Sequence, residues 1–356
     1  MARFGIEEEF VLLDEQTLVP TAMSTSTRER LAEEVGAGLT PEYLTCQIES
    51  ATAPIENRAD AEAQLRRTRH LLGTYAADQN AIIGATGTPF ISPNRFAVSS
   101  SAHYDAVSTQ LVEITREHEV NGLHVHVEVT DDEERVRVVN RVRAWLPTLL
   151  ALTGNAPFAH GRDSGFASWR SILIRRLPSS WSPPHFRDLD DYRAQLARLV
   201  AMGAIPEASS LSWTVRLSER FPTVEVRVFD AQLTVDDTLL AAALTRALLV
   251  SDALDGLPEL GVDAIDASLW TAARYGPEAL LVDPASGDPA PASAIVDDLL
   301  LRLHPTLESL GDQDFVTDGI ARIRAEGSGA RRQRDAYTEN GTAGLRELYR
   351  RSSATD

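Results

Sequence analysis

Two glutamates near the start of the chain have a spacing that suits joint binding of a metal ion. Glu7 and Glu9 lie two residues apart within 4–13, an apolar segment with the character of a strand. Residues two apart on a strand project from the same face, with Cα atoms about 7 Å apart. Two carboxylates this close repel each other unless a cation lies between them, and their hard oxygen atoms suit Mg²⁺ or Mn²⁺. An edge strand whose glutamates face water is the alternative that this motif leaves open.

Two histidines repeat this arrangement further along the chain. His124 and His126 alternate with apolar residues within 121–129, a pattern that predicts a second strand. The two imidazoles therefore share one face of that strand, and histidine can bind a metal or, when protonated, donate to phosphate. A histidine pair with a purely structural role is the other interpretation.

Two more segments contribute carboxylates. Glu225 and Arg227 share one face of a predicted strand at 223–229, where they could bind ligands or form an ion pair with each other. Glu49 lies in another alternating segment, 43–53. Three or four carboxylates with one histidine can hold two divalent ions and leave positions for phosphate oxygens.

All the fixed positive charge comes from arginine. The sequence contains no lysine, so its 34 basic residues are arginines, and Schiff-base or P-loop chemistry is excluded. Arg170, Arg216 and Arg227 have no acidic residue directly beside them in the sequence, so they could bind phosphate or a substrate carboxylate bidentately. Cys46 is the only cysteine, which excludes disulfides and thiolate zinc sites.

Composition and charge narrow the class of protein. With 356 residues, 43% of them hydrophobic, the chain can bury a large core. The net charge of -18 argues against nucleic acid or an anionic membrane as a partner, because both need a basic surface. The first ten residues carry three glutamates instead of the apolar run of a signal peptide, and no stretch reaches 18 apolar residues, so we expect a cytoplasmic protein.

The elements that must position these residues alternate between strands and helices. Strands are predicted at 4–13, 43–53, 81–86, 121–129, 209–217 and 223–229, and helices at 26–35, 59–79, 131–152 and 236–254. Asp131 is the expected cap of its helix, and Pro147 predicts a kink within it. The hairpin around 218–222 favours an antiparallel sheet, so the predicted class is α+β.

Loops and domain boundaries follow from Gly, Pro and Ser. Segments 87–101 and 154–165 are predicted loops of a length that is usually functional or mobile. The stretch 284–291 is predicted to be a surface loop or a linker within a mostly helical C-terminal third. Its weak change in composition does not justify a boundary, so 1–356 is predicted to be a single catalytic domain.

Seven short motifs resemble, in order, those of the bacterial carboxylate-amine ligases called glutamate-cysteine ligase type 2. Three of them are GIEEEF at 5–10, GLHVHV at 122–127 and TVEVR at 223–227. The others are NAPF at 155–158, ASWRS at 167–171, WTAARYG at 270–276 and GARRQR at 329–334. The ordered series, which spans almost the whole chain, is more specific than any one motif.

The resemblance implies a fold and a set of roles. This family is grouped with glutamine synthetases and guanidino kinases, which implies a curved antiparallel sheet, flanked by helices, with metals and nucleotide on its concave face. By this resemblance the Mg²⁺ ligands, with Mn²⁺ as the alternative ion, are Glu7, Glu9, Glu49, His124 and Glu225. His126, Arg216 and Arg227 are expected near the ATP phosphates, and Arg170 and Arg216 near a substrate carboxylate or phosphate. The residues expected to act in catalysis are Glu225, Arg227 and Arg170.

The implied reaction joins glutamate to an amine. ATP would phosphorylate the side-chain carboxylate of L-glutamate, and an amine such as L-cysteine would displace phosphate from the acyl phosphate to give a γ-glutamyl amide. We expect 87–101 and 154–165 to exclude water from this intermediate. Small molecules are thus the expected partners, and a homo-oligomer remains open.

Two departures from the family pattern concern the acceptor. Asn121 stands where the family has a cysteine, and Trp181 stands where it usually has a glycine. Both lie close to motif residues and could alter the acceptor pocket, so the identity of the amine stays open. Neither coincides with an expected metal ligand.

Two other functions are compatible with parts of the sequence. A metal-dependent hydrolase could hold zinc at the His-x-His strand, but only His160, His185 and His304 follow, in no recognisable motif. A non-catalytic family member that binds nucleotide is the second alternative. It is disfavoured because a chain without catalysis has no physical reason to keep so many like charges together on apolar strands.

Overall fold

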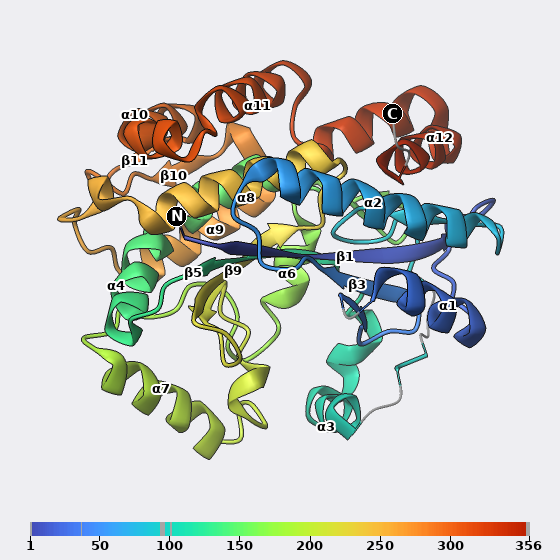
Figure 1. Ribbon diagram of the computed structural model, residues 1–356, viewed down its shortest axis with the longest axis horizontal. Coiled ribbons are helices and arrows are strands. Elements are labelled where there is room, and N and C mark those ends of the chain that lie inside the picture. Colours follow the sequence, from blue (N-terminus) through green and yellow to red (C-terminus); the bar gives the residue numbers. More distant parts are fainter. Residues whose placement is uncertain (1, 37, 93–96, 100–101, 354–356) are drawn as a thin grey trace.

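An antiparallel sheet forms the centre of the protein, for which a computed structural model describes residues 2–36, 38–92, 97–99 and 102–353 (Figure 1). Its strand order is β2-β3-β1-β5-β9-β8, and β4 also pairs with β1. The bounds are β1 Phe4–Asp14, β2 Leu39–Pro41, β3 Gln47–Ala51, β4 Ala81–Gly84, β5 Gly122–Glu128, β8 Val215–Leu217 and β9 Thr223–Asp230. The predicted antiparallel sheet is confirmed. β1 lies inside the sheet, so the edge-strand interpretation of its glutamates is wrong.

Twelve α-helices surround this sheet within the described part of the chain. They are α1 Thr25–Val35, α2 Arg58–Ala77, α3 Ala102–Leu111, α4 Asp132–Val142, α5 Leu146–Thr153, α6 Trp169–Ile174, α7 Leu189–Ala201, α8 Val235–Val250, α9 Val262–Tyr275, α10 Ala292–Leu310, α11 Gln313–Glu326 and α12 Gly329–Ser353. Figure 1 shows α2 and α8 above β1, with α10, α11 and α12 beyond them, whereas α3 and α7 lie below the sheet. The last third is mostly helical, as predicted.

Alternation along the strands explains which face is covered. Ile6, Val125 and Val226 point away from the charged residues beside them and are fully buried in the main hydrophobic core with α8. Their neighbours in sequence therefore face the other side of the sheet, because side chains alternate with a period of two. The charged residues singled out in the sequence consequently gather on one face.

Glu8 is the exception on the covered face. Its carboxylate pairs with Arg69 of α2, with Arg69 Nη2 2.5 Å from Glu8 Oε1, and it accepts a hydrogen bond from Thr238 of α8 at 2.6 Å. Both charged side chains are almost fully buried. Losing one partner would leave an uncompensated buried charge, so this pair ties β1 specifically to α2 and α8.

Several predicted elements differ in detail. The predicted helix at 131–152 is α4 and α5 joined by a 3-10 turn at Arg143–Trp145, and Asp131 caps α4 as expected. Pro147 lies in the first turn of α5, where its missing N–H has no intrahelical partner to lose, so no mid-helix kink arises. The strands predicted at 43–53 and 209–217 shorten to β3 and β8.

Other elements were not predicted. The loop 154–165 contains a small hairpin, β6 Phe158–Ala159 with β7 Arg162–Asp163, and 284–291 ends in β11 Pro289–Pro291, which pairs with β10 Leu280–Val282. Helices α3 and α7 were also missed. For α7 the sequence did contain a signal: Asp188 is a typical N-cap residue, and the apolar residues Tyr192 and Leu196 lie four positions apart. In the structure Asp188 caps α7, and both of these side chains are buried.

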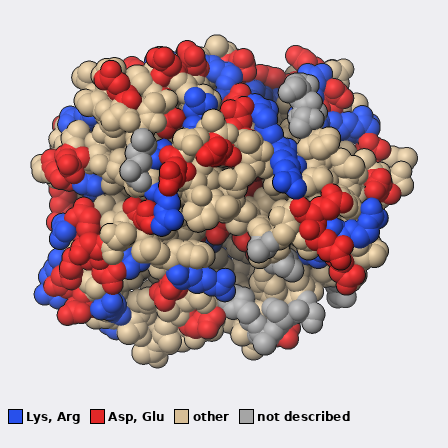
Figure 2. Space-filling model, viewed as in Figure 1, with Lys and Arg blue, Asp and Glu red and all other residues tan. Residues whose placement is uncertain are grey.

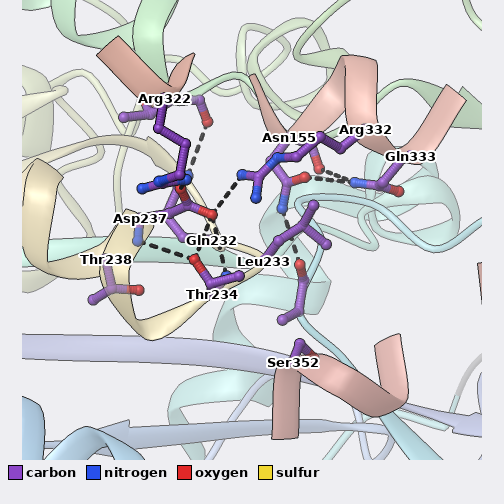
Figure 3. A network of polar contacts seen from close by, with 12 residues as sticks. Asn155, Gln232, Leu233, Thr234, Asp237, Thr238, Arg322, Arg332, Gln333 and Ser352 are labelled. Carbon is purple, nitrogen blue, oxygen red and sulfur yellow. Dashed lines mark hydrogen bonds and ion pairs between the residues drawn. The ribbon is translucent and has the colours of Figure 1, made fainter. Parts of the chain in front are cut away.

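Polar contacts join the C-terminal helices to α8 and to the segment after α5 (Figure 3). Asp237, near the start of α8, binds Arg322 of α11 at 2.6 Å and Arg332 of α12 at 2.5 Å. Gln333 of α12 donates to the side chain of Asn155 at 2.6 Å. Arg332 and Gln333 of the motif at 329–334 therefore join α12 to the body of the fold, and Arg322 joins α11 to it.

Charged side chains of both signs lie on the face of the molecule that Figure 2 shows. Acidic and arginine side chains are interspersed over the face shown in Figure 2. Within the described ranges, no helix combines the length and apolar character needed to cross a membrane.

Candidate active site

The register of four strands brings the predicted metal-binding residues together. Glu7 on β1 lies opposite His124 on β5, and Glu9 lies opposite Glu49 on β3. On the other side of β5, His126 lies opposite Glu225 of β9. Directly paired residues point to the same face with Cβ atoms about 5 Å apart. All the acidic and imidazole residues predicted from four separate segments therefore share one surface, here named the carboxylate cluster: Glu7, Glu9, Glu49, His124, His126 and Glu225.

Distances within the carboxylate cluster are short enough for shared ligands. His124 Nδ1 lies 3.0 Å from Glu7 Oε2, and His126 Nε2 lies 3.3 Å from Glu7 Oε1. One group of candidate ligand atoms, from Glu7, His124 and Glu225, lies within 4.8 Å of one another, and so does a second, from Glu9, Glu49 and His124. Because His124 belongs to both groups, the cluster offers two adjacent positions for cations.

Burial and neighbouring groups shift the pKa values of two glutamates of the cluster in opposite directions. Burial, with help from Glu7 and Glu9, raises the pKa of Glu49 to about 7. Burial opposes ionisation of Glu7, but hydrogen bonds from His124 and His126 hold its pKa well below the ordinary value. Carboxylates that retain protons near neutral pH would release them to a divalent cation, and the oxygen-rich donor set fits Mg²⁺.

Glu42 joins this environment and was missed in the sequence. Its pKa is raised to about 8 by burial and then by Glu9 and Glu49. It precedes the alternating segment that contains Glu49 by a single residue, so no strand pattern marked it. Its acidic character beside that segment was the one available signal.

Two of the predicted arginines are paired with the cluster. Arg216 Nε lies 2.7 Å from Glu225 Oε2, and Arg227 also binds Glu225, forming the ion pair that the sequence allowed. Neither arginine has an acidic residue directly beside it in the sequence, but both pair with Glu225 in the fold. Burial opposes ionisation of Glu225, but Arg227 and Arg216 hold its pKa below the ordinary value.

Arg170 occupies a different environment. It is buried, and its closest carboxylate, Asp230 at the end of β9, is 3.8 Å away. Asp230 accepts hydrogen bonds from the Asn155 N–H and the Ser168 hydroxyl, both at 2.7 Å. Ser168 is also the cap of α6, so Asp230 connects the helix that carries Arg170 to the sheet.

Two cavities adjoin different parts of the carboxylate cluster. The first cavity, of about 260 Å³, is lined by Glu9 and His124 together with Glu42, Arg170 and Arg227. The second cavity, of about 630 Å³, is lined by Glu7 and His126 together with Thr52, Arg67 and Phe221. One end of the cluster, formed by Glu9 and His124, therefore adjoins the first cavity, and the other end, formed by Glu7 and His126, adjoins the second.

The described residues of the two predicted closing loops do not line these cavities. Thr88 donates to the Phe158 carbonyl at 2.9 Å, and the Gly161 N–H donates to the Phe90 carbonyl at 2.8 Å, so the two loops pack against each other. Residues 93–96 and 100–101 of the first loop lie outside the described residues. The described remainder of both loops contributes no lining residue to either cavity. Segments around α3 and 178–181 line the first cavity instead.

Comparison with known proteins identifies the family. A model of glutamate-cysteine ligase family 2 matches residues 3–351. A protein of Mycobacterium sp. (strain KMS), named as a candidate glutamate-cysteine ligase 2-2, is 39% identical over 343 residues, which cover 95% of this chain and 94% of that protein.

Solved structures agree on the fold. A glutamate-cysteine ligase of Francisella tularensis in complex with AMP has a TM-score of 0.75 at 14% identity, covering 99% of this chain and 88% of that chain. A bifunctional glutathione synthetase of Pasteurella multocida has a TM-score of 0.74 at 14% identity, covering 99% of this chain and 52% of that chain. The similarity in sequence extends over nearly the whole chain, and the resemblance inferred from the motifs is confirmed. The chain belongs to glutamate-cysteine ligase family 2 and is thus a carboxylate-amine ligase.

Proposed function

We propose that this chain, acting over 1–356 as one catalytic unit, uses ATP and Mg²⁺ to join the side-chain carboxylate of L-glutamate to an amine. The observation that carries the proposal is the carboxylate cluster with a separate cavity at each end. Such an arrangement lets two substrates approach the same charged centre from different directions. The AMP bound to the Francisella tularensis ligase supports a nucleotide as one of them.

The metal ions would be held by the cluster. Glu7, His124 and Glu225 would hold one ion, and Glu9, Glu49 and His124 would surround the other. A bound divalent ion would offset the negative charge that develops on the phosphoryl oxygens. Glu42, close to the second group, would add a further oxygen ligand or hold a proton there.

The two cavities suggest a division of substrates. The second cavity is the larger and is lined by Arg67 and by the Phe221 ring, so it suits a nucleotide whose phosphates reach His126 and Glu7. The first cavity contains the buried guanidinium of Arg170, which suits a substrate carboxylate. Glu225 would orient Arg216 and Arg227 toward the phosphoryl group in transfer.

The reaction then runs in two displacements. A glutamate side-chain oxygen attacks the γ-phosphorus of ATP, the bond to the bridging oxygen breaks, and ADP leaves. The amine attacks the carbonyl carbon of the acyl phosphate, phosphate leaves, and the amine nitrogen loses a proton to give the amide. Arg227 and Arg216 would stabilise charge on the phosphoryl oxygens in both steps.

The test measures ADP and phosphate release from ATP and Mg²⁺ with L-glutamate and a panel of amines, with product masses read in parallel. A γ-glutamyl amide formed only when both glutamate and an amine are present is the expected result. Release of ADP and phosphate with another carboxylic acid, but not with L-glutamate, would show that the carboxylate substrate is not glutamate. Failure of every carboxylate and amine combination, despite tight binding of Mg²⁺ and ATP, would contradict the proposed reaction.

A further inference from the structure

Trp181 has a backbone conformation that favours glycine. Its φ of +73° lies in the left-handed region, which a bulky side chain rarely adopts. The Thr214 N–H and the Thr214 hydroxyl both donate to the Trp181 carbonyl, at 2.9 and 2.8 Å. The indole N–H donates to the Ser171 carbonyl at 3.1 Å. Hydrogen bonds at the backbone and at the ring therefore hold a strained residue, and such strain persists mostly at functional positions.

The Trp181 side chain forms part of the wall of the first cavity. Its ring is buried and carries the Arg175 guanidinium 4.5 Å from the ring centre. Ile174 and Leu177, which precede it in the chain, line the same cavity. The strained position thus places a large flat ring beside the space next to Glu9 and His124.

Helix α3 supplies another part of this wall. Tyr104, Val107 and Leu111 line the first cavity from positions three and four residues apart, which share one face of a helix. The charged lining residues come mostly from the sheet, whereas α3 and the 174–181 segment contribute mainly apolar and aromatic groups. The cavity therefore combines a charged region at the carboxylate cluster with an extended apolar region.

We propose that this apolar region binds the side group of the acceptor amine, that the group is aliphatic and larger than the cysteine side chain, and that Trp181 sets its size. The inference rests on the proposed function, since it names the acceptor class of that reaction. A larger aliphatic group removes more apolar surface from water on binding, and this burial favours the bound state. A cysteine side chain leaves much of this surface uncovered, and its thiol is only a weak hydrogen-bond donor.

The first measurement compares kcat/KM for L-alanine, L-cysteine, L-leucine and L-phenylalanine at saturating L-glutamate and ATP. We expect leucine to exceed cysteine by about 10-fold or more, the lower end of the discrimination that one or two methylenes give in an apolar pocket. Cysteine preferred over leucine by a similar factor would overturn the inference.

The second measurement alters the wall. Trp181→Gly relieves the backbone and opens the cavity, so the ratio of kcat/KM for phenylalanine to that for alanine is expected to rise at least about 10-fold. Val107→Trp narrows the cavity from α3 and should lower the leucine-to-alanine ratio by a similar factor, which keeps the test decisive if the glycine variant does not fold. Trp270→Ala, which removes a half-exposed tryptophan outside both cavities, should leave all ratios unchanged. Unchanged ratios in both cavity variants would overturn the role of Trp181.

A binding measurement separates this inference from the proposed reaction. If no amine supports turnover, the reaction fails, and the cavity is judged by thermal shift with Mg²⁺ and ATP present. Leucine is then expected to raise the melting temperature of the wild type more than serine does, and Val107→Trp should abolish that difference. Equal shifts for leucine and serine in the wild type would overturn the inference independently of catalysis.

Discussion

Glu225 is the residue on which the charges of the site converge. Its carboxylate pairs with Arg216 and Arg227 and also lies 3.9 Å from His126 Nε2. It belongs at the same time to one of the two groups of candidate metal ligands. A single carboxylate therefore sets the position of two arginines and, in the proposed reaction, would also contribute charge to a cation, so both roles depend on its ionised state.

Removal of this charge should stop catalysis without unfolding the chain. Glu225→Gln keeps nearly the same volume but loses the negative charge, so ATP turnover should fall at least about 100-fold, as it does when one electrostatic contact to a transition state is lost. The rate is measured as ADP release, and the melting temperature is measured in parallel. Glu347→Gln, an exposed change on α12, is the matched control and should retain full activity. Wild-type rates in Glu225→Gln would remove this residue from the site.

A substitution of Arg170 tests whether the first cavity binds the carboxylate substrate. Its buried fork-shaped guanidinium suits bidentate binding of a carboxylate, which a lysine ammonium cannot reproduce. Arg170→Lys should therefore raise the KM for L-glutamate about 10-fold or more while changing the KM for ATP much less. Equal changes in both KM values would contradict the assignment of the first cavity to the carboxylate substrate.

At the scale of elements, Asp230 joins β9 to α6. Its carboxylate accepts hydrogen bonds from the hydroxyl of Ser168, which caps α6, and from the backbone N–H of Asn155. Burial raises the pKa of Asp230 to about 6, although the nearby Arg170 opposes this shift. A carboxyl whose pKa is raised on folding favours the fold most below its ordinary pKa near 3.8 and loses that contribution as pH rises through 6. The connection that positions Arg170 is thus sensitive to pH in the mildly acidic range.

Asp230→Asn removes this titration. Between pH 4 and pH 7, the free energy of unfolding of the wild type should fall relative to that of Asp230→Asn by roughly 2 kcal/mol, since one pKa unit corresponds to about 1.4 kcal/mol and pH 4 lies just above the ordinary pKa. Urea unfolding at the two pH values measures the difference. A constant difference between the two proteins would show that Asp230 does not titrate in this range.

Across the whole molecule, one buried carboxylate holds three helices. Asp237 caps the start of α8 together with Thr234 and binds Arg322 of α11 and Arg332 of α12 (Figure 3). Burial opposes ionisation of Asp237, but Arg332 and Arg322 lower its pKa below 3.8. Its contribution to stability is therefore present above pH 3.8 and is lost as pH falls through the lowered pKa.

Asp237→Asn should consequently destabilise the protein at neutral pH. The change leaves two arginines without their partner charge, and we expect a loss of roughly 3 kcal/mol, at the lower end for a buried pair because both arginines are partly exposed. Thermal or urea unfolding at pH 7 measures this loss, and the gap between variant and wild type should narrow below pH 3.8. Equal stability at pH 7 would show that α11 and α12 are held by other contacts.

The sequence by itself determined which residues share a face within each strand. Glu7 with Glu9, His124 with His126 and Glu225 with Arg227 follow from a side-chain period of two, which is a local property of an extended backbone. The motifs and their order also identified the family, since they are read directly from the chain. The antiparallel pairing of β8 with β9 was also predictable, because only a short hairpin connects these two strands in the sequence.

The tertiary structure alone decided which strands are neighbours and in what register. The pairing of Glu7 with His124, the addition of Glu42, and the ion pairs of Arg216 and Arg227 with Glu225 depend on contacts across turns and between distant segments. The same holds for the positive φ of Trp181, which Thr214 maintains from another segment. Such features arise only when the core fixes the strands against the helices, because no local pattern encodes the distance between residues far apart in the chain.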